Sequence, residues 1–382
     1  MSTVIDTRAI AEAFERNFSE RGEIGASVSI WSGGEEILSL HHGSRTKDEV
    51  VTWHRDTLVP VWSVTKGPAA LAFLLTLHEA GLHLDTPVME VWPELRARMT
   101  FGQMLSHQGG LPALDAPPSV FHHEAVAAAL AKQAPHWEPG TAHGYHPRTF
   151  GFLLEECARR LTGGRGIGQI LHERITGPLD AEFWIGLPLE HHHRVARLYP
   201  GRLRTHTPGD PEGAFLSAFG LPHYLTRRAF TSPAGLHAIS DMNLPAAWSA
   251  GLAAFGGAGS ARGLGKIYAL LAAGGLWQGR RLVPETVIRW LSSPITQGSD
   301  VVLLMPTAFS AGCMMDPVDP ATGKKLTHRF GSSPNAFGHP GAGGSLAFAA
   351  PALDLAFAYV MNQMEQGVMP GEKALSLTAA LG

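Results

Sequence analysis

Cysteine is scarce in this sequence, which has only Cys157 and Cys313 among its 382 residues. Two cysteines cannot form a disulfide framework, so an apolar core must stabilise the chain, and this usage suits a reducing compartment. Charge is sparse as well: Asp, Glu, Lys and Arg make up 16% of the residues, and the formal net charge is −3. Because nucleic acids and anionic membranes are bound through basic surfaces, we expect neither as a partner. A small molecule of low charge fits this composition better.

Long apolar runs are also missing. Gly, Pro or a charged residue interrupts each apolar stretch before it reaches the roughly 20 residues that span a membrane. The first 20 residues mix acids with bases and lack the basic segment and apolar core of a secretory signal. The sequence therefore predicts a cytoplasmic protein without a membrane segment, and it leaves the oligomeric state open.

Two common kinds of hydrolytic site have no signature here. No serine lies in Gly-x-Ser-x-Gly, which excludes the nucleophile elbow of α/β-hydrolases. The 20 histidines include His191-His192-His193, but three adjacent side chains do not easily face one ion. His78 and His83 do not have the spacing of the zinc-binding His-Glu-x-x-His helix. We expect neither a metal nor a cofactor.

A serine and a lysine stand three residues apart in Ser63-Val64-Thr65-Lys66. Helical periodicity follows from Ala69 to Leu82, so both side chains should share a face at the start of a packed helix. Ser44-Arg45-Thr46-Lys47 has the same spacing but lies in a polar stretch typical of a solvated turn. A lysine whose pKa is lowered by burial can take the proton of a serine, which makes Ser63 a candidate nucleophile and Lys66 its general base. The alternative is a helix-capping serine beside a surface lysine.

Apolar periodicity predicts a mixture of helices and strands. Helices are expected over 5–20, 69–80, 101–106, 123–132, 150–161, 167–175, 261–273, 284–291 and 372–380, and strands over 25–30, 36–41, 344–348 and 354–361. Ser32-Gly33-Gly34 joins the first two strands into a hairpin. Strands near both ends of the chain can share one sheet.

This order of elements predicts an α/β plus all-α fold. Residues 1–60 and 260–382 should form an α/β sandwich domain, with a mainly helical domain, 61–259, inserted between them. Periodicity fails over 186–259, and a segment of this length without it is typical of a pocket wall or lid. Phe219, Tyr224 and Trp248 in that segment are candidate substrate-binding residues. A pocket is expected where the two domains meet.

Two further segments supply what a serine–lysine pair needs. Tyr145, in a turn-rich stretch before the helix at Phe150, has an ionisable hydroxyl that could relay a proton to a leaving group. His339-Pro340-Gly341-Ala342-Gly343-Gly344 precedes a strand, and its glycines would let a substrate carbonyl approach backbone N–H donors. Taken alone, a core tyrosine and a tight turn explain these segments equally well.

Together, Ser63-x-x-Lys66, Tyr145 and His339-Pro340-Gly341 resemble the three motifs of the serine β-lactamase and penicillin-recognising superfamily. The order and spacing of the motifs are most similar to those of class C β-lactamases and the esterases related to them. The resemblance implies an antiparallel sheet flanked by helices. It also implies that Ser63 is the nucleophile, that Lys66 and Tyr145 are the coupled base and acid, and that the N–H groups of Ser63 and Ala342 form the oxyanion hole.

Two departures from the class C pattern narrow the expected substrate. Pro147 stands where the family has an asparagine, and His339, mostly neutral near pH 7, stands where it has a lysine. His339 and Gly341 should still contact the substrate. The variant resembles the family VIII carboxylesterases, which implies a serine hydrolase for short-chain, uncharged carboxylic esters. An acyltransferase, an amide hydrolase, weak β-lactamase activity and a catalytically silent scaffold are the alternatives.

Overall fold

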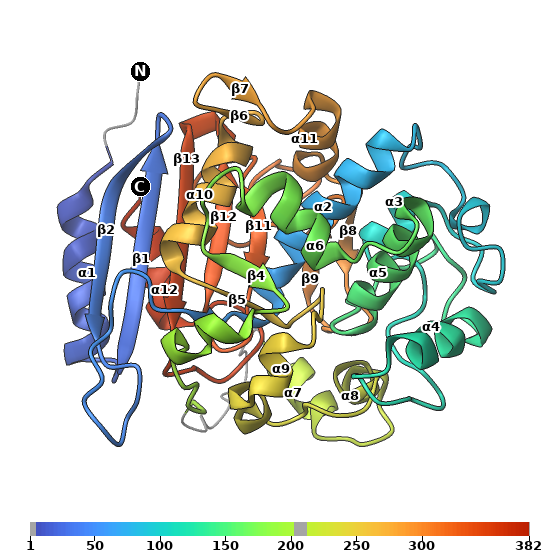
Figure 1. Ribbon diagram of the computed structural model, residues 1–382, viewed down its shortest axis with the longest axis horizontal. Coiled ribbons are helices and arrows are strands. Elements are labelled where there is room, and N and C mark those ends of the chain that lie inside the picture. The colour runs from blue at the N-terminus through green and yellow to red at the C-terminus, as the bar shows by residue number, and fades with distance from the viewer. Residues whose placement is uncertain (1–4, 202–211, 382) are drawn as a thin grey trace.

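An eight-stranded antiparallel sheet dominates one half of the computed structural model, which describes residues 5–201 and 212–381 (Figure 1). Its strands lie in the order β2 (Glu35–Gly43), β1 (Gly25–Ser32), β13 (Leu355–Met361), β12 (Leu346–Ala350), β11 (Phe337–Pro340), β10 (Met314–Met315), β9 (Pro306–Phe309) and β8 (Thr296–Ser299). The register joins the two ends of the chain, because Ala26 of β1 lies opposite Met361 of β13. Strands from both termini therefore share one sheet, as the sequence predicts.

The hairpin β1–β2 turns at Gly33 and Gly34, whose φ angles are +60° and +77°. Two successive residues in the left-handed region form the turn that matches the twist of a two-stranded ribbon, and glycine adopts that region without steric cost. The pair Gly33-Gly34 therefore forms the turn, and the pairing of the two strands shifts by one residue between Ile30 and Trp31.

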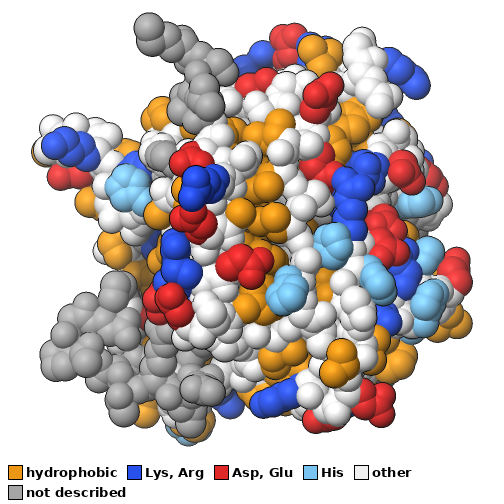
Figure 2. All heavy atoms as spheres, turned by 90° about the vertical axis from the view of Figure 1, so that its left-hand side faces the viewer, with side chains coloured by type: hydrophobic (Ala, Val, Ile, Leu, Met, Phe, Trp, Pro, Cys, Tyr) orange, Lys and Arg blue, Asp and Glu red, His pale blue; other side chains and the backbone are white. Residues whose placement is uncertain are grey.

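Helices cover both faces of this sheet. Helix α10 (Ala261–Ala272) packs against β1, β12 and β13, while α1 (Thr7–Ser19) and α12 (Glu372–Ala379) pack together on the other face. Every residue of β12 and β13 is buried, whereas β2, at the edge, alternates between exposed and half-buried positions. On the side of the molecule drawn in Figure 2, acidic and basic side chains are interspersed.

The remaining elements lie beside the sheet. They are α2 (Lys66–Glu79), α3 (Phe101–Leu105), α4 (His123–Lys132), α5 (Thr149–Thr162), α6 (Ile167–Leu171), α7 (Gly213–Phe219), α8 (Leu225–Thr231), α9 (Pro245–Ser249), α11 (Glu285–Ser292), the strands β3 (Val59–Pro60), β4 (Phe183–Ile185) and β5 (Gly257–Gly259), and the ribbon β6 (Leu276–Trp277) and β7 (Arg280–Arg281). Short 3-10 turns span Trp62–Thr65, Val88–Glu90, Leu189–Arg194, Ile239–Asn243 and Pro351–Leu353, and a π-helical turn, His172–Thr176, continues α6.

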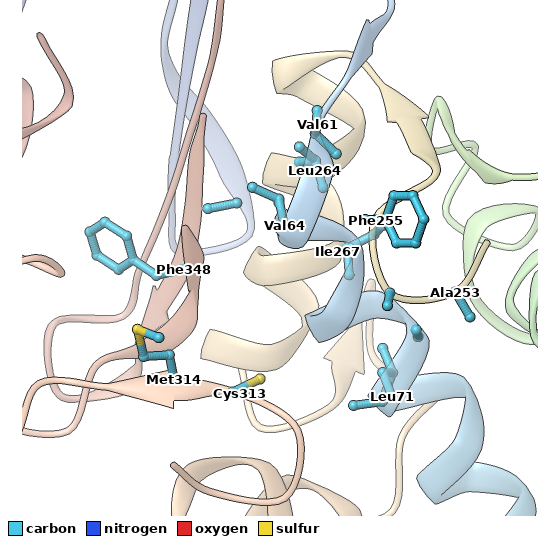
Figure 3. Close-up of a cluster of buried hydrophobic side chains, with 14 of the residues drawn as sticks. Val61, Val64, Leu71, Ala253, Phe255, Leu264, Ile267, Cys313, Met314 and Phe348 are labelled. Atoms are coloured by element: carbon cyan, nitrogen blue, oxygen red, sulfur yellow. The ribbon is translucent and has the colours of Figure 1, made fainter. Parts of the chain in front are cut away.

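Helix α2 is the central helix of the fold. Its first twelve residues, Lys66 to Leu77, are all buried, so the helix has no solvent face at its start. In Figure 3, Val64 and Leu71 at the start of the helix lie beside Leu264 and Ile267 of α10, and Cys313 points toward the helix from the sheet side, whereas Met314 and Phe348 point away from it. The packing fixes the segment that carries Ser63 and Lys66.

The segment 186–259 differs from its expected loop character. Its described residues contain α7 and α8, of seven residues each, and α9, of five. Helices of two turns or less are too short to produce the periodicity that identifies a helix in a sequence. In the described part of the chain, no helix has both the length and the apolar character needed to cross a membrane.

Candidate active site

Ser63 lies on a 3-10 turn, Trp62–Thr65, that leads directly into α2. In a 3-10 turn the side chains at i and i+3 eclipse each other, which brings Ser63 and Lys66 onto one side. Trp62, just before the serine, has a φ of +50°, which is costly for a bulky residue. The turn is held by neighbouring bonds: Val61 N–H donates to Gly257 O at 2.9 Å, and Gly257 N–H donates to Thr65 Oγ1 at 2.9 Å.

Pro68 lies in the first turn of this helix. It is the third residue of α2, where a backbone N–H would have no intrahelical acceptor. Its missing donor therefore costs no hydrogen bond.

The Lys66 amine is completely buried and lies 3.4 Å from Ser63 Oγ. It donates hydrogen bonds to Pro147 O at 2.8 Å and to Ala254 O at 2.9 Å. Desolvation lowers the pKa of Lys66 well below its ordinary value. A neutral amine has two N–H bonds, and both are used by these carbonyls, so its lone pair is left to accept the proton of Ser63. These surroundings provide what the predicted role of Lys66 as general base requires.

Tyr145 is buried beside this pair, and Lys66 Nζ lies 4.8 Å from the centre of its ring. Its ring also stacks on Phe309 at 6.2 Å. Burial raises the pKa of the Tyr145 hydroxyl above its ordinary value, while a hydrogen-bonding interaction with Ser63 opposes the rise. The hydroxyl therefore keeps its proton near neutral pH and can donate it.

Asp300 holds the backbone of Tyr145 in place, and nothing in the sequence singles it out. Its two carboxylate oxygens accept from Tyr145 N–H at 3.1 and 3.0 Å, and also from Val302 N–H, Leu303 N–H and the Thr307 hydroxyl. The side chain is 1% exposed, and desolvation raises the pKa of Asp300 to about 6. Asp300 thus joins the turn that carries Tyr145 to the β8–β9 connection.

Two buried histidines, His107 and His146, pack behind Tyr145. His107 contacts the Tyr145 ring at 5.0 Å and accepts from His146 N–H at 3.2 Å, and His146 Nε2 accepts from Leu111 N–H at 2.9 Å. Burial lowers the pKa of His107 well below its ordinary value and that of His146 to about 3. Both rings are neutral hydrogen-bonding partners that shape the turn.

The Nε2 atom of His339 lies 3.5 Å from the Tyr145 hydroxyl oxygen. Its Nδ1 lies 2.7 Å from Pro340 O, which assigns the ring proton to Nδ1. Burial, with a smaller contribution from Lys66, lowers the pKa of His339 to about 3. The imidazole is therefore neutral, so it offers no positive charge to a substrate carboxylate.

The glycine-rich turn after His339 brings a backbone donor to Ser63. Gly341 packs so closely against Val61 that a Cβ atom would lie 2.3 Å from Val61 O, which only glycine avoids. The N–H groups of Gly341, Gly343 and Gly344 donate hydrogen bonds to backbone carbonyls. Within the described residues, the N–H groups of Ser63 and Ala342 donate to no other group. These two donors lie at the same cavity and are available to a substrate oxygen.

The cavity in front of Ser63 is small, about 20 Å³, and mostly apolar. Phe230, Leu303, Met314, Val368 and Met369 line it together with Ser63, Tyr145, His339, Pro340 and Ala342. These apolar walls come from four separate parts of the chain, so no local pattern in the sequence marks them.

Three candidate wall residues from the sequence do not line this cavity. Trp248 donates from its indole N–H to Met242 O at 2.6 Å and packs against a separate cluster that includes Leu58. Tyr224 is 46% exposed at the start of α8. Phe219 lies behind Phe230 as seen from the cavity, and the centres of the two rings are 5.7 Å apart. The correction follows from the helices α7 to α9, which direct Phe230 into the cavity and these three side chains elsewhere.

In residues 5–201 and 212–381, no three His, Cys, Asp or Glu side chains lie close enough together to hold a metal ion. The adjacent histidines have different partners: the ring of His191 contacts Trp184 at a tilt, and that of His192 contacts Trp248 edge-on.

A half-buried serine hydroxyl 3.4 Å from a buried lysine amine, beside a tyrosine and with the backbone of Ala342 at the same cavity, is the arrangement of a serine acyl-transfer site of the Ser-x-x-Lys type. The chain belongs to the Beta-lactamase family, which matches residues 11–380. The antiparallel sheet with its flanking helices is the fold that the resemblance predicts.

Solved structures and a curated relative are similar over nearly the whole chain. A family VIII carboxylesterase is 30% identical with a TM-score of 0.85, covering 98% of this chain and 96% of that one. A penicillin-binding protein homologue from Caulobacter crescentus is 32% identical with a TM-score of 0.82, covering 98% and 96%. The esterase/beta-lactamase LipL of Mycobacterium tuberculosis is 26% identical over 93% of this chain and 81% of that protein.

Proposed function

We propose that the protein is a carboxylesterase, a serine hydrolase that cleaves short-chain, uncharged carboxylic esters through an acyl-enzyme on Ser63. The observation that carries the proposal is the hydrogen bonding of Lys66, whose two N–H bonds are directed to Pro147 O and Ala254 O while Ser63 Oγ lies 3.4 Å from the nitrogen. The similarity to a family VIII carboxylesterase and to LipL supports it.

Acylation starts when Ser63 Oγ attacks the ester carbonyl carbon and its proton moves to Lys66 Nζ. The carbonyl oxygen, now negative, accepts from the N–H groups of Ser63 and Ala342, which stabilise it as the charge develops. When the intermediate collapses, the bond to the alcohol oxygen breaks and Tyr145 gives that oxygen its proton. The Lys66 ammonium returns a proton to Tyr145, so the step releases one alcohol and leaves the acyl group on Ser63.

Deacylation repeats the chemistry with water as the nucleophile. A water molecule loses a proton to the basic pair and adds to the acyl carbon, and the bond to Ser63 Oγ breaks as the serine regains its proton. The products are a carboxylic acid and the original enzyme.

The substrate class follows from the cavity walls. The cavity is small and mostly apolar and the buried His339 is neutral, so none of the described side chains that line it offers a charge to an anionic acyl group. Where class C enzymes have an asparagine, Pro147 supplies only its carbonyl, which is engaged with Lys66. A short neutral acyl chain matches this environment.

The test compares Ser63→Ala with wild type on p-nitrophenyl acetate and butyrate, and labels both with a fluorophosphonate. We expect wild type to hydrolyse both esters and take the label, and Ser63→Ala to do neither. Ser44→Ala, in the other Ser-x-x-Lys sequence, is the matched control and should behave as wild type. A wild-type protein without label or turnover would instead indicate a silent scaffold, and esters of an added alcohol among the products would indicate acyl transfer.

A further inference from the structure

Arg148 is a buried arginine at the N-terminal end of α5, and it is 5% exposed. Its guanidinium donates to three backbone carbonyls of one distant segment. Nη1 donates to Phe230 O at 3.2 Å and to Leu236 O at 3.4 Å, and Nη2 donates to Gly235 O. Desolvation lowers the pKa of Arg148 to about 10, which still leaves the guanidinium charged near pH 7. A single buried cation therefore holds both ends of the segment 230–236.

This segment, 230–236, carries a wall of the cavity at the nucleophile. Phe230 lines that cavity, and the centre of its ring lies 6.3 Å from that of the Tyr145 ring. The middle of the segment has a separate anchor, because Ser232 Oγ accepts from Leu114 N–H at 2.8 Å. The guanidinium thus holds the backbone on either side of this anchor, and one of the carbonyls it holds belongs to Phe230 itself.

The same arginine is attached to the backbone that surrounds the base. Pro147, which directly precedes Arg148, accepts from Lys66 Nζ at 2.8 Å, and Ala254 O accepts from it at 2.9 Å. The guanidinium carbon lies 4.7 Å from the centre of the ring of Phe255, the residue after Ala254. Arg148 therefore joins the wall segment to the part of the fold that positions Lys66.

We propose that Arg148 is a positioning residue that holds Phe230 at the cavity and thereby limits the length of the acyl chain. The inference rests on the proposed function, since it concerns the ester bound at Ser63. The planar fork of a guanidinium can donate to several carbonyls at once, whereas a lysine ammonium is a compact point charge. An apolar side chain of similar length would leave three carbonyls without their donor, so the segment would move toward other donors or water.

The first test measures the ratio of kcat/KM for p-nitrophenyl hexanoate over that for the acetate. Arg148→Met should raise this ratio by about threefold to tenfold, because a displaced Phe230 leaves room for the longer chain. Arg159→Met is the matched control: Arg159 is in the last turn of α5, partly exposed, and pairs with Glu155 at 2.8 Å. Its ratio should stay at the wild-type value. An unchanged ratio in Arg148→Met, or an equal rise in both variants, would overturn the proposal.

A double variant distinguishes positioning of the wall from a general loss of stability. If Arg148 acts through Phe230, Arg148→Met/Phe230→Ala should have the same ratio as Phe230→Ala alone, because no wall remains to be displaced. A role in stability alone would lower the melting temperature of Arg148→Met without changing the ratio. Effects of the two substitutions that multiply, as independent changes do, would contradict the proposal.

Arg148→Lys keeps the inference testable if Arg148→Met does not fold. The ammonium retains the positive charge and can donate to some of the three carbonyls. Its ratio should lie between those of wild type and Phe230→Ala, and combining it with Phe230→Ala should again add nothing. A wild-type ratio in Arg148→Lys would count against the proposal, because a positive charge alone would then be sufficient at this position.

Failure of the proposed function would give a different result. Wild type would then hydrolyse neither p-nitrophenyl acetate nor the hexanoate, and no ratio could be measured. Failure of the present inference alone would leave wild-type hydrolysis intact, with a ratio that does not respond to changes at Arg148.

Discussion

Lys66 and Lys373 are both buried lysines, but their surroundings give them opposite roles. Lys373 Nζ lies 3.2 Å from Glu23 Oε1, in an ion pair that joins α12 to the start of β1. Among the described residues, Lys66 has only carbonyl oxygens and a serine hydroxyl within hydrogen-bonding distance, and desolvation lowers its pKa. The two buried lysines thus differ in whether a carboxylate compensates the charge, and only the surroundings of Lys66 suit the proposed role of a base.

The largest expected effect comes from removing the base. Lys66→Met should lower kcat/KM for p-nitrophenyl acetate by about 10³, the size of a lost general base. Lys47→Met, which changes the exposed lysine of the other Ser-x-x-Lys sequence, should leave kcat/KM unchanged. Steady-state kinetics on both variants measure this. Retention of most activity in Lys66→Met would end the distinction between the two buried lysines.

Removing the other buried lysine, Lys373, should lower the free energy of unfolding and leave catalysis unchanged. Lys373→Met leaves Glu23 buried without its partner, which should cost about 3–5 kcal/mol in the free energy of unfolding. Urea unfolding measures the loss, and the kcat of the folded protein should be unchanged. The double variant Glu23→Gln/Lys373→Met should recover part of the loss, because no uncompensated charge remains. A double variant less stable than the single one would contradict this.

Asp300→Asn tests how the turn of Tyr145 is positioned. An amide presents N–H groups where the carboxylate accepts them, so Tyr145 should shift and kcat should fall by about 10² with little change in KM. Stability gives a second measurement. Burial raises the pKa of Asp300 to about 6, so its contribution to stability is complete below about pH 4 and is lost as the pH rises through 6.

The free energy of unfolding of wild type should therefore include a fall of about 2–3 kcal/mol from this group between pH 4 and 7, which Asp300→Asn should remove. If Asp300→Asn changed stability but left kcat intact, Asp300 would serve the fold alone.

The smallest effect concerns chain length. Phe230→Ala enlarges the cavity at Ser63 and should raise the ratio of kcat/KM for hexanoate over acetate esters by about tenfold, because the longer chain fills the new space. Trp248→Ala is the matched control, since Trp248 lies outside this cavity, and its ratio should stay at the wild-type value. Equal ratios in the two variants would refute the assignment of Phe230 as a wall.

The sequence predicts what local patterns encode. The hairpin β1–β2, the helices α2, α5 and α10, and the strands β12 and β13 are long enough for periodicity, and Ser63, Lys66, Tyr145 and Ala342 lie in recognisable motifs. The strands β8 to β11 have two to four residues each, which is too short for a pattern.

The rest of the site depends on contacts between distant segments. Asp300 becomes significant only when the β8–β9 connection packs against Tyr145, 155 residues away in sequence. Phe230 and Met369 likewise become neighbours only through the tertiary fold.

The most direct test of the account is the rate at which Ser63 becomes acylated as a function of pH. Rapid-quench mass spectrometry with p-nitrophenyl butyrate would follow the butyryl group on the peptide that contains Ser63. Because Lys66 must be neutral to accept the proton, the rate should rise about tenfold per pH unit at low pH and level off well below the ordinary lysine pKa of about 10.4. A rate that continued to rise to pH 10, or a butyryl group on another residue, would contradict the account.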